Sequence, residues 1–342
     1  MDKINRKKFL QLLGSLVAGG SLLSVSGIFL RKMFVIPKGM LPASAENSLT
    51  TGAGTGAGKD YVSPYKLVSS FKVHDAIEAF ELLDERLVVA TANSVSIYDR
   101  NGTLTNNFAA GSNLRDISAD ANLIYLLFPT RIEVYDEAGG LVREWMACSD
   151  NSDYCSFTVT AGGVFVTDAA NKNICKYTNE GQFVKFINSP NKFVIPSYTF
   201  GITCIDEVIY CSNSGRHLIE SYTLDGEYLG SFGKAGMQGG RFCGCCNPVH
   251  LTKTSTGEII TSEKGLPRIS CYGRDGEFRS VLIDNHTLGG GHQAYEVKVD
   301  GDKMLVAGHN QISIYQYDKS PIAKTACSVC GVSRCELREV RS

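Results

Sequence analysis

The sequence has neither an excess of charge of one sign nor a high content of polar residues, the two features that would indicate nucleic-acid binding or disorder. Its 342 residues carry 34 basic and 35 acidic side chains, so the net charge of −1 excludes nucleic-acid binding driven by bulk charge. Charged residues make up only 20% of the chain and apolar residues 43%, a balance that argues against bulk disorder and allows a sizeable core. Only nine prolines accompany 35 glycines, which is typical of a chain with many tight turns.

Catalytic signatures are also missing from the sequence. We find no nucleophile elbow, phosphate-binding loop or pair of catalytic carboxylates. Cysteines number twelve of 342 residues, too sparse for a small disulfide-stapled scaffold. Six of the twelve nevertheless fall in two tight groups, which makes them the first candidates for a functional site.

The N-terminal segment, residues 1–45, has the features of an export signal or a membrane anchor. A basic stretch at residues 5–8 precedes an apolar run from Leu12 to Leu30, and Ala43-Ser44-Ala45 offers a small-residue cleavage site. The basic stretch resembles a twin-arginine export signal in which Lys7 replaces the second arginine. An uncleaved anchor is the alternative, because the apolar run is nearly long enough to span a bilayer. We expect a periplasmic or extracytoplasmic body, tethered by a flexible linker at residues 46–62.

A repeated unit fills residues 63–319. Each unit carries short β-rich runs and then a turn that begins with tyrosine and in five units ends with glycine. The six tyrosines lie 37 to 50 residues apart, the period of a four-stranded propeller blade; they are Tyr98, Tyr135, Tyr177, Tyr222, Tyr272 and Tyr315. An eight-stranded sandwich would not show this fixed period. The sequence therefore predicts an all-β, six-bladed β-propeller.

The repeats resemble NHL repeats, most closely at residues 163–174, and the resemblance implies a propeller fold but no particular function. The sixth unit ends at Asp318, just before Ser320-Pro321, and so lacks a fourth strand. The unassigned run from Tyr65 to Phe71 is expected to supply that strand and close the ring, because an open ring would leave unpaired edges.

Two cysteine groups predict a cofactor site. Cys243, Cys245 and Cys246 lie in the loop that enters the innermost strand of blade 5. The second group lies in the cysteine-rich tail, residues 320–342, and comprises Cys327, Cys330 and Cys335. Short Cys-containing loops place thiolates around iron or zinc, so the two groups together could hold one [4Fe-4S] cluster. In an exported chain, disulfides that pin the tail are an alternative, as is zinc.

The preferred cluster ligands are Cys243, Cys246, Cys327 and Cys330. Adjacent residues in extended chain point in opposite directions, so Cys245 and Cys246 are not expected to bind the same cluster. Of the remaining cysteines, Cys148 and Cys155 flank an acidic loop and could form a disulfide. The other four are expected to be small buried residues of strands: Cys175, Cys204, Cys211 and Cys271.

Histidines offer a second candidate site. His250 should begin an inner strand, and His292 precedes the inner strand of the next blade, with His74 more distant. Some NHL-type enzymes, the amidating lyases, bind a metal through histidines in the central channel. Polar residues that line a wet channel mouth are the simpler interpretation.

These features favour an exported electron-transfer protein, or a subunit of a redox complex, rather than an enzyme. Its partner would be a redox protein or a membrane complex, and the N-terminal segment would contact the membrane if it is not cleaved. The alternatives are a binding propeller with a disulfide-pinned tail, and a lyase or hydrolase with a metal in the channel.

Overall fold

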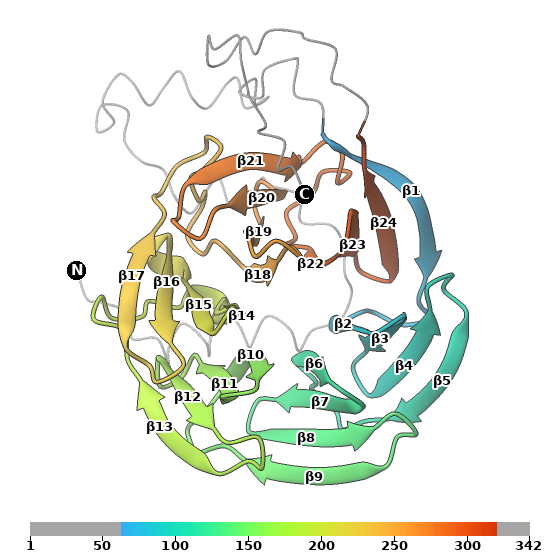
Figure 1. Cartoon of the computed structure of the whole chain (residues 1–342), viewed down its shortest axis with the longest axis vertical. Helices are drawn as coiled ribbons and strands as arrows, with labels where there is room; N and C mark the ends of the chain where they lie inside the picture. Colours follow the sequence, from blue (N-terminus) through green and yellow to red (C-terminus); the bar gives the residue numbers. More distant parts are fainter. Residues whose placement is uncertain (1–62, 320–342) are drawn as a thin grey trace, which may run out of the picture. The chain divides into compact units, whose positions relative to one another are not determined.

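The computed structural model describes residues 63–319. These residues form six four-stranded antiparallel sheets arranged in a ring (Figure 1). The predicted six-bladed propeller is thus confirmed. The expected export segment, the linker to residue 62 and the cysteine-rich tail lie outside the described residues.

The blades follow one another along the chain, and within each blade the first strand is innermost. Blade 1 contains β2 (Ala79–Leu83), β3 (Arg86–Ala90), β4 (Ser94–Asp99) and β5 (Leu104–Ala109). Blade 2 contains β6 (Asp116–Asp120), β7 (Leu123–Phe128), β8 (Arg131–Asp136) and β9 (Leu141–Met146). Blade 3 contains β10 (Tyr154–Thr160), β11 (Gly163–Asp168), β12 (Asn173–Tyr177) and β13 (Phe183–Ile187).

The second half of the ring repeats the pattern, with two short 3-10 helices in blade 4. Blade 4 contains η2 (Pro196–Tyr198), β14 (Ile202–Ile205), β15 (Val208–Asn213), η3 (Ser214–Arg216), β16 (Leu218–Thr223) and β17 (Tyr228–Phe232). Blade 5 contains β18 (His250–Lys253), β19 (Ile259–Glu263), β20 (Arg268–Tyr272) and β21 (Phe278–Ile283). Blade 6 contains β22 (Glu296–Asp300), β23 (Lys303–Ala307), β24 (Gln311–Tyr317) and the N-terminal strand β1 (Tyr65–Lys72).

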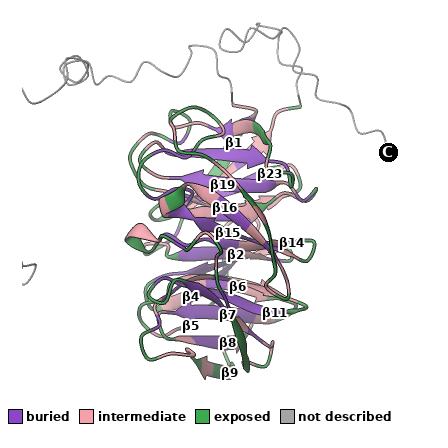
Figure 2. Ribbon diagram, turned by 90° about the vertical axis from the view of Figure 1, so that its left-hand side faces the viewer, coloured by how far each residue is buried: buried purple, intermediate pink, exposed green. Residues whose placement is uncertain are grey.

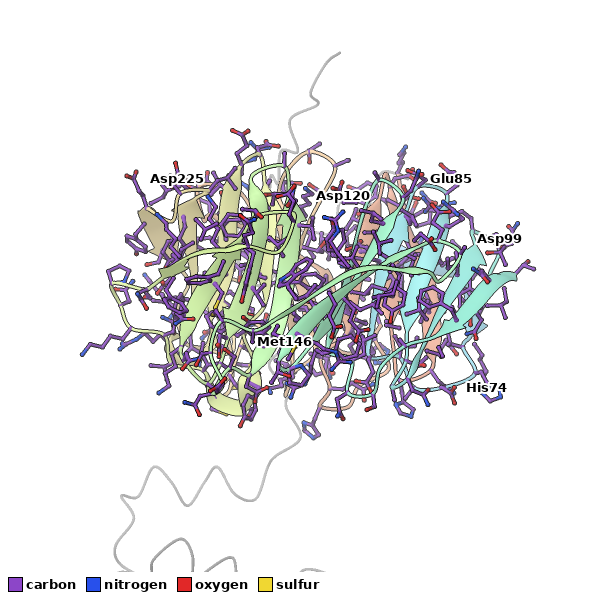
Figure 3. All side chains as sticks on the ribbon, turned by 90° about the horizontal axis from the view of Figure 1, so that it is seen from below. His74, Glu85, Asp99, Asp120, Met146 and Asp225 are labelled. Atoms are coloured by element: carbon purple, nitrogen blue, oxygen red, sulfur yellow. The ribbon has the colours of Figure 1, made fainter. Side chains whose placement is uncertain are left out.

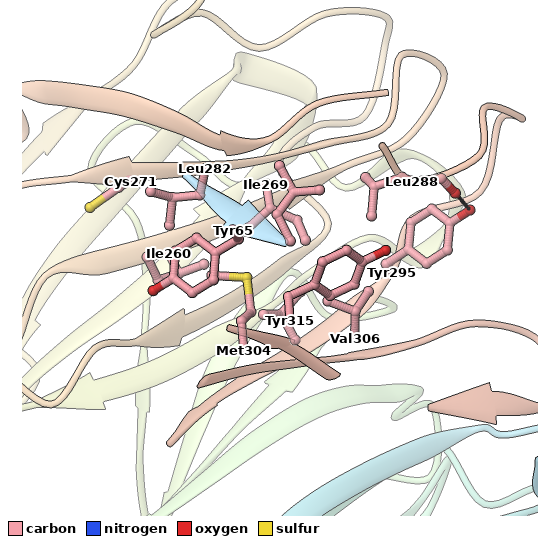
Figure 4. Packing of buried hydrophobic residues seen from close by; sticks show 12 residues of the cluster. Tyr65, Ile260, Ile269, Cys271, Leu282, Leu288, Tyr295, Met304, Val306 and Tyr315 are labelled. Atoms are coloured by element: carbon pink, nitrogen blue, oxygen red, sulfur yellow. Dashed lines mark hydrogen bonds between the residues drawn. The ribbon is translucent and has the colours of Figure 1, made fainter. Parts of the chain in front are cut away.

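The ring closes through the N-terminal strand, as the sequence predicts. Strand β1 pairs antiparallel with β24, with Tyr65 opposite Tyr317 and Lys72 opposite Gln311. Tyr65 also packs into the apolar cluster between blades 5 and 6, beside Ile260 and Met304 (Figure 4). The strand therefore pairs with the outer edge of β24 and completes the apolar contact between blades 5 and 6.

The two faces of the ring differ in their connections. Loops that link consecutive blades lie on one face, where the inner strands begin; we call it the loop face. Turns between the first and second strands, and between the third and fourth, lie on the other, which we call the turn face. Figure 3 shows His74 and Met146 toward the loop face, and Asp99, Asp120 and Asp225 toward the turn face.

Neighbouring blades are joined by a repeated apolar contact. In four joints an aromatic side chain of one outermost strand lies against the repeat tyrosine of the next blade, with ring centroids 5.2 to 6.3 Å apart; the pairs are Phe71–Tyr98, Phe108–Tyr135, Trp145–Tyr177 and Phe232–Tyr272. Edge-on and tilted ring pairs of this kind add to the stabilisation from buried area. The repeat tyrosines thus lie at the contacts between neighbouring blades.

The glycine of the tyrosine-containing turn completes five of the six joints. In five turns its φ lies between +78° and +90°, a region that L-residues with a side chain rarely adopt. A Cβ atom there would lie 2.5 to 2.6 Å from a side chain of the preceding outermost strand; the glycines are Gly102, Gly139, Gly181, Gly226 and Gly276. Backbone conformation and close packing therefore both require the repeated glycine.

Burial follows the same plan around the ring (Figure 2). Second strands are almost wholly buried between blades, as in β11, whereas outermost strands such as β9 alternate between exposed and half-buried residues. Within residues 63–319, no helix is long and apolar enough to cross a membrane.

Candidate functional site: the central channel and its loop-face mouth

The central channel contains a cavity of about 430 Å³ that is lined by the inner strands of all six blades. Among the described residues that line it, the acidic side chains outnumber the basic ones; they are Glu81, Asp116, Asp206, Glu207 and Glu296, against Lys253 and Lys298. Two smaller cavities, of about 190 and 240 Å³, adjoin it toward the loop face. His250 and Glu296 line all three cavities, so the loop-face mouth of the channel is where they meet.

Lys298 organises the charges inside the channel. Its Nζ lies 2.9 Å from Oε2 of Glu81 and 3.4 Å from Oε1 of Glu296, which joins blade 6 to blade 1. The carboxylates raise the pKa of the Lys298 ammonium above its usual value against the opposing effect of burial, so the lysine stays charged. One fixed cation is therefore shared by two carboxyl groups.

Two carboxyl groups also accept hydrogen bonds from the inner edge of the next blade. Oε2 of Glu296 lies 3.0 Å from the backbone nitrogen of Phe80 in blade 1. Oδ2 of Asp116 accepts hydrogen bonds from Ser156 Oγ at 2.6 Å and from the backbone nitrogen of Phe157 at 3.1 Å. Inner strands are sheet edges with unpaired N–H groups, and these carboxyl groups satisfy some of them. Both side chains thus have a structural role as well as a place in the channel.

Burial changes the protonation of these groups. It raises the pKa of Glu296 to about 8, a rise that Asp116 and Glu81 reinforce and Lys298 opposes. Burial also raises the pKa of Asp116 above its usual value. Near neutral pH the channel therefore holds one carboxyl group, that of Glu296, that can take up or release a proton when a charged molecule binds.

His250 begins strand β18 at the mouth of the channel, as predicted. Burial, followed by the charges of Lys298 and Lys264, lowers the pKa of His250 to about 4, so its imidazole is neutral at pH 7. The structure does not bring the other predicted histidines to it. His292 is exposed in the loop before β22, where Nδ1 lies 3.2 Å from the Gly265 oxygen, and His74 is exposed beside Asp75.

The cysteine loop between β17 and β18 lies on the loop face, where the sequence predicts it. Asn247 fixes its end: Nδ2 donates to the carbonyl oxygens of Cys243 at 2.7 Å and Lys264 at 2.8 Å, and Oδ1 accepts from the Lys264 backbone at 2.9 Å. The buried Glu263–Arg268 ion pair, with Nε and Oε1 2.6 Å apart, lies beneath. Arg268 also donates to two carbonyl oxygens of residues 237–241, so the loop is tied to the body of blade 5.

Within this loop, Cys243 and Cys246 are buried and Cys245 is exposed. The expectation that Cys245 and Cys246 point in opposite directions is wrong: their Sγ atoms are 3.4 Å apart. The loop is irregular rather than extended, and Gly244 has a φ of +71°, so the alternation of strand side chains does not apply. Among residues 63–319, no three His, Cys, Asp or Glu side chains are grouped closely enough to hold a metal ion.

The other predicted cluster ligands, Cys327, Cys330 and Cys335, lie outside the described residues. The last described residue, Lys319, pairs with Asp302 in the β22–β23 turn, with Nζ and Oδ2 3.2 Å apart, and so lies at the turn face. The cysteine loop is at the loop face. The strand order therefore separates Lys319 from the cysteine loop by the thickness of the ring.

The expected partner of Cys148 is also different. Its Sγ lies 3.3 Å from Sγ of Cys175, in β12, whereas Cys155 packs on the other side of β10. Neighbouring residues of a strand face opposite sides, so Tyr154 lies toward blade 2 and Cys155 toward blade 4. Cys148 and Cys155 therefore lie apart, although they flank the same loop.

The acidic residues of the channel and Lys298 were not predicted from the sequence. Glu81, Asp116 and Glu296 are scattered over more than 200 residues and share no motif. Their common signal is position, since each lies within the first three residues of an inner strand. His309, in the turn between β23 and β24, lines a loop-face cavity together with Glu296 and was not identified from the sequence either.

Fold and site together define a six-bladed β-propeller with a charged central channel and a buried histidine at its mouth. No protein-family model matches the sequence, and no curated protein matches it. The resemblance to NHL repeats therefore stays a prediction, as do the export signal and the iron–sulfur motif.

Comparison with solved structures identifies other proteins of this fold. Virginiamycin B lyase from Staphylococcus aureus is 15% identical, with a TM-score of 0.56, and the match covers 74% of this chain and 99% of that one. A catalytically inactive variant of the same lyase, solved with quinupristin, matches with a TM-score of 0.52 at the same identity and coverage. A protein of unknown function from Bacteroides caccae is 8% identical with a TM-score of 0.53, covering 68% and 90% of the two chains. At these identities the comparison shows the fold alone.

Proposed function

We propose that the chain is a binding propeller that holds a small organic cation in its central channel. The observation that carries this proposal is the lining of the main cavity, where five carboxyl groups outnumber two lysines, although Asp206 also pairs with Arg274 and Glu296 is ionised mainly above about pH 8. A concave site with an excess of one sign of charge concentrates ligands of the opposite sign, and low-dielectric walls strengthen the effect. A volume of about 430 Å³ is in the range of small-molecule sites.

The internal ion pairs support this choice of ligand. Lys298 occupies one oxygen of Glu81 and one of Glu296, and each carboxylate has further lone pairs to offer. A primary ammonium or guanidinium group supplies several N–H donors to such oxygens. The neutral imidazole of His250 adds one acceptor at the mouth without adding positive charge.

A matched pair of four-carbon probes tests the proposal. Putrescine carries two ammonium groups and succinate two carboxylates, so the pair differs in charge and little in length. We expect a panel of small amines that includes putrescine to raise the melting temperature of the full chain, and succinate to leave it unchanged. Stabilisation by the anion, or by none of the cations, would contradict the proposal.

Channel variants locate the binding. Glu296→Gln keeps the size of the side chain and removes the negative charge that Glu296 carries above its folded pKa of about 8, so at pH 9 we expect at least a tenfold loss of affinity for the amine, about 1.4 kcal/mol. Asp225→Asn is the matched control, since Asp225 lies on the turn face and is largely exposed. Equal losses in both variants would indicate general charge attraction rather than a channel site.

The cysteine loop favours a second candidate, an iron–sulfur site that serves electron transfer with a redox partner or membrane complex. Two buried thiols, Cys243 and Cys246, lie in a loop tied down by Asn247 and Arg268, and Asn247 Nδ2 lies 3.7 Å from the Cys243 sulfur. N–H groups directed at sulfur are typical of cluster sites. A complete ligand set would need thiols from beyond Lys319, and the chain would have to cross from the turn face to reach the loop.

Iron and acid-labile sulfide in anaerobically purified full chain test this candidate. We expect a brown protein that absorbs at about 400 nm, and Cys243→Ser should remove the colour while the propeller stays folded. Cys271→Ser, in a strand of blade 5 away from the loop, should keep it. A colourless protein without iron would rule the cluster out and leave the cation proposal untouched.

Export is proposed on the N-terminal segment alone. Expression of the full chain, followed by fractionation, is expected to place the propeller beyond the cytoplasmic membrane, either released or retained by residues 1–45. Replacement of Arg6 and Lys7 by glutamine should keep it in the cytoplasm.

A further inference from the structure

Two cysteines that are far apart in sequence have their sulfur atoms in contact. Cys148 lies in the loop between β9 and β10, and Cys175 lies in β12, with a distance of 3.3 Å between the Sγ atoms. We infer that Cys148 and Cys175 are a disulfide site of blade 3, which closes when the chain meets a thiol–disulfide oxidoreductase in its disulfide form. The inference does not depend on the ligand of the channel.

The surroundings hold both thiols in place. The Cys148 sulfur lies 3.6 Å from the hydroxyl of Tyr154, and the Cys148 backbone nitrogen donates to the same hydroxyl at 3.2 Å. Tyr154 in turn bonds to the hydroxyl of Tyr177, two residues beyond Cys175. A disulfide needs its sulfurs about 2.05 Å apart, so each has to move by less than ~1 Å from the observed contact.

Exposure assigns the order of the reaction. Cys148 is half-buried and Cys175 is fully buried, so an external disulfide reaches Cys148 first. The Cys148 thiolate attacks the disulfide of the oxidoreductase and forms a mixed disulfide, and Cys175 then displaces the enzyme's sulfur. One S–S bond forms and one breaks, the two protein thiols lose two protons and two electrons, and the oxidoreductase is released as a dithiol.

The closed bond would fix part of the channel mouth. It would tie the loop that precedes β10 to β12, and that loop carries Asp153, whose Oδ1 lies 3.2 Å from Arg115. Further along the same segment, Ser156 donates to Asp116 in the channel. A disulfide here thus joins the rim of the channel covalently to the third strand of blade 3.

The alternative partner, Cys155, has a different environment. Its sulfur lies 3.6 Å from the Asp153 carbonyl oxygen, on the side of β10 that packs toward blade 4. Burial raises the pKa of the Cys155 thiol to about 12, and it raises the pKa of the Cys175 thiol as well, so thiol acidity does not distinguish the two candidate partners. Geometry therefore favours Cys175 over the sequence neighbour.

Peptide mapping distinguishes the two pairings. Trypsin cleaves after Arg143, Lys172 and Lys176, so Cys148 and Cys155 share the peptide 144–172 and Cys175 lies in the peptide 173–176. The full chain is treated with oxidised glutathione, its free thiols are blocked under denaturing conditions, and it is digested without reductant. We expect peptides 144–172 and 173–176 to be linked, and to separate on reduction.

Two variants and a stability measurement complete the test. Cys148→Ser should abolish the link, and the control Cys155→Ser should retain it. Reduction should lower the melting temperature of the wild type by about 5 °C and leave that of Cys148→Ser unchanged. An internal bond within peptide 144–172, or free thiols at both positions in the oxidised wild type, would overturn the inference.

Discussion

The joints between blades and the central channel are built on opposite principles. Four of the six joints repeat the same apolar contact between an aromatic side chain, a tyrosine and a glycine, so each of these residues has one shape-determined role. The channel is lined by equivalent strands, yet Glu81, His250 and Glu296 occupy it without any repeat. The residues that repeat from blade to blade stabilise the ring, whereas the residues that do not repeat line the channel, where a ligand can bind.

The largest effect is expected from a joint glycine. In Gly139→Ala the new Cβ would lie 2.6 Å from the Phe108 side chain at a φ of +88°. Backbone strain and overpacking together should cost about 3 kcal/mol of unfolding free energy. Chemical denaturation measures the loss.

The matched control is Gly265→Ala, with a φ of +83° and open space around the missing Cβ. We expect the free energy of unfolding to fall by about 1 kcal/mol in this variant, from backbone strain alone. Equal losses in the two variants would show that packing at the joint is not what requires glycine.

The next effect concerns the joint that closes the ring. Phe71, in the N-terminal strand, packs against Tyr98 of blade 1 with ring centroids 5.5 Å apart. Phe71→Ala should lower the free energy of unfolding by about 2 kcal/mol, because it removes a partly buried aromatic side chain from the contact between blades 6 and 1. Phe186→Ala, at a side chain that is 44% exposed, should cost less than about 1 kcal/mol. A reversed order would mean that the N-terminal strand contributes little to closure.

In the channel we expect a change in pH dependence rather than a large loss of stability. The folded pKa of Glu296, about 8, lies above its usual value of 4.5, so the folded state holds the proton more tightly. Stability from this group is complete below pH 4.5 and falls as the pH rises toward 8, by up to about 1.4 kcal/mol per pH unit.

Glu296→Gln should therefore flatten unfolding free energy against pH between 5 and 8. A residual slope should remain, because burial also raises the pKa of Asp116, while Lys298 acts on both carboxyl groups and Glu81 acts on Glu296. An unchanged curve in this variant would show that Glu296 does not titrate in this range.

His250 should have the opposite and smaller effect. Its folded pKa, about 4, lies below its usual value of 6.5, so stability from this group is present above pH 6.5 and is lost as the pH falls toward 4. We expect the His250→Gln variant to lose less unfolding free energy than the wild type when the pH is lowered from 6.5 toward 4. Greater acid sensitivity in the variant would contradict a buried neutral imidazole.

The sequence predicts the joints far better than the channel, for a physical reason. A period of 37 to 50 residues and strands such as 163–168 can be recognised because every blade solves the same packing problem. The contact between Cys148 and Cys175, and the convergence of Glu81, Glu296 and Lys298, depend on which strands the ring brings together. His250 could be placed because the blade pattern marks where β18 begins.

Calorimetric titration of putrescine into the full chain, at pH 7 and pH 9, tests the central claim most directly. The account predicts saturable binding by the wild type, tighter at pH 9 because Glu296 is then ionised. It predicts at least a tenfold loss in Glu296→Gln, and no loss in Asp225→Asn. Binding that is absent, or that is unaffected by Glu296→Gln and by pH, would contradict a cation site in the central channel.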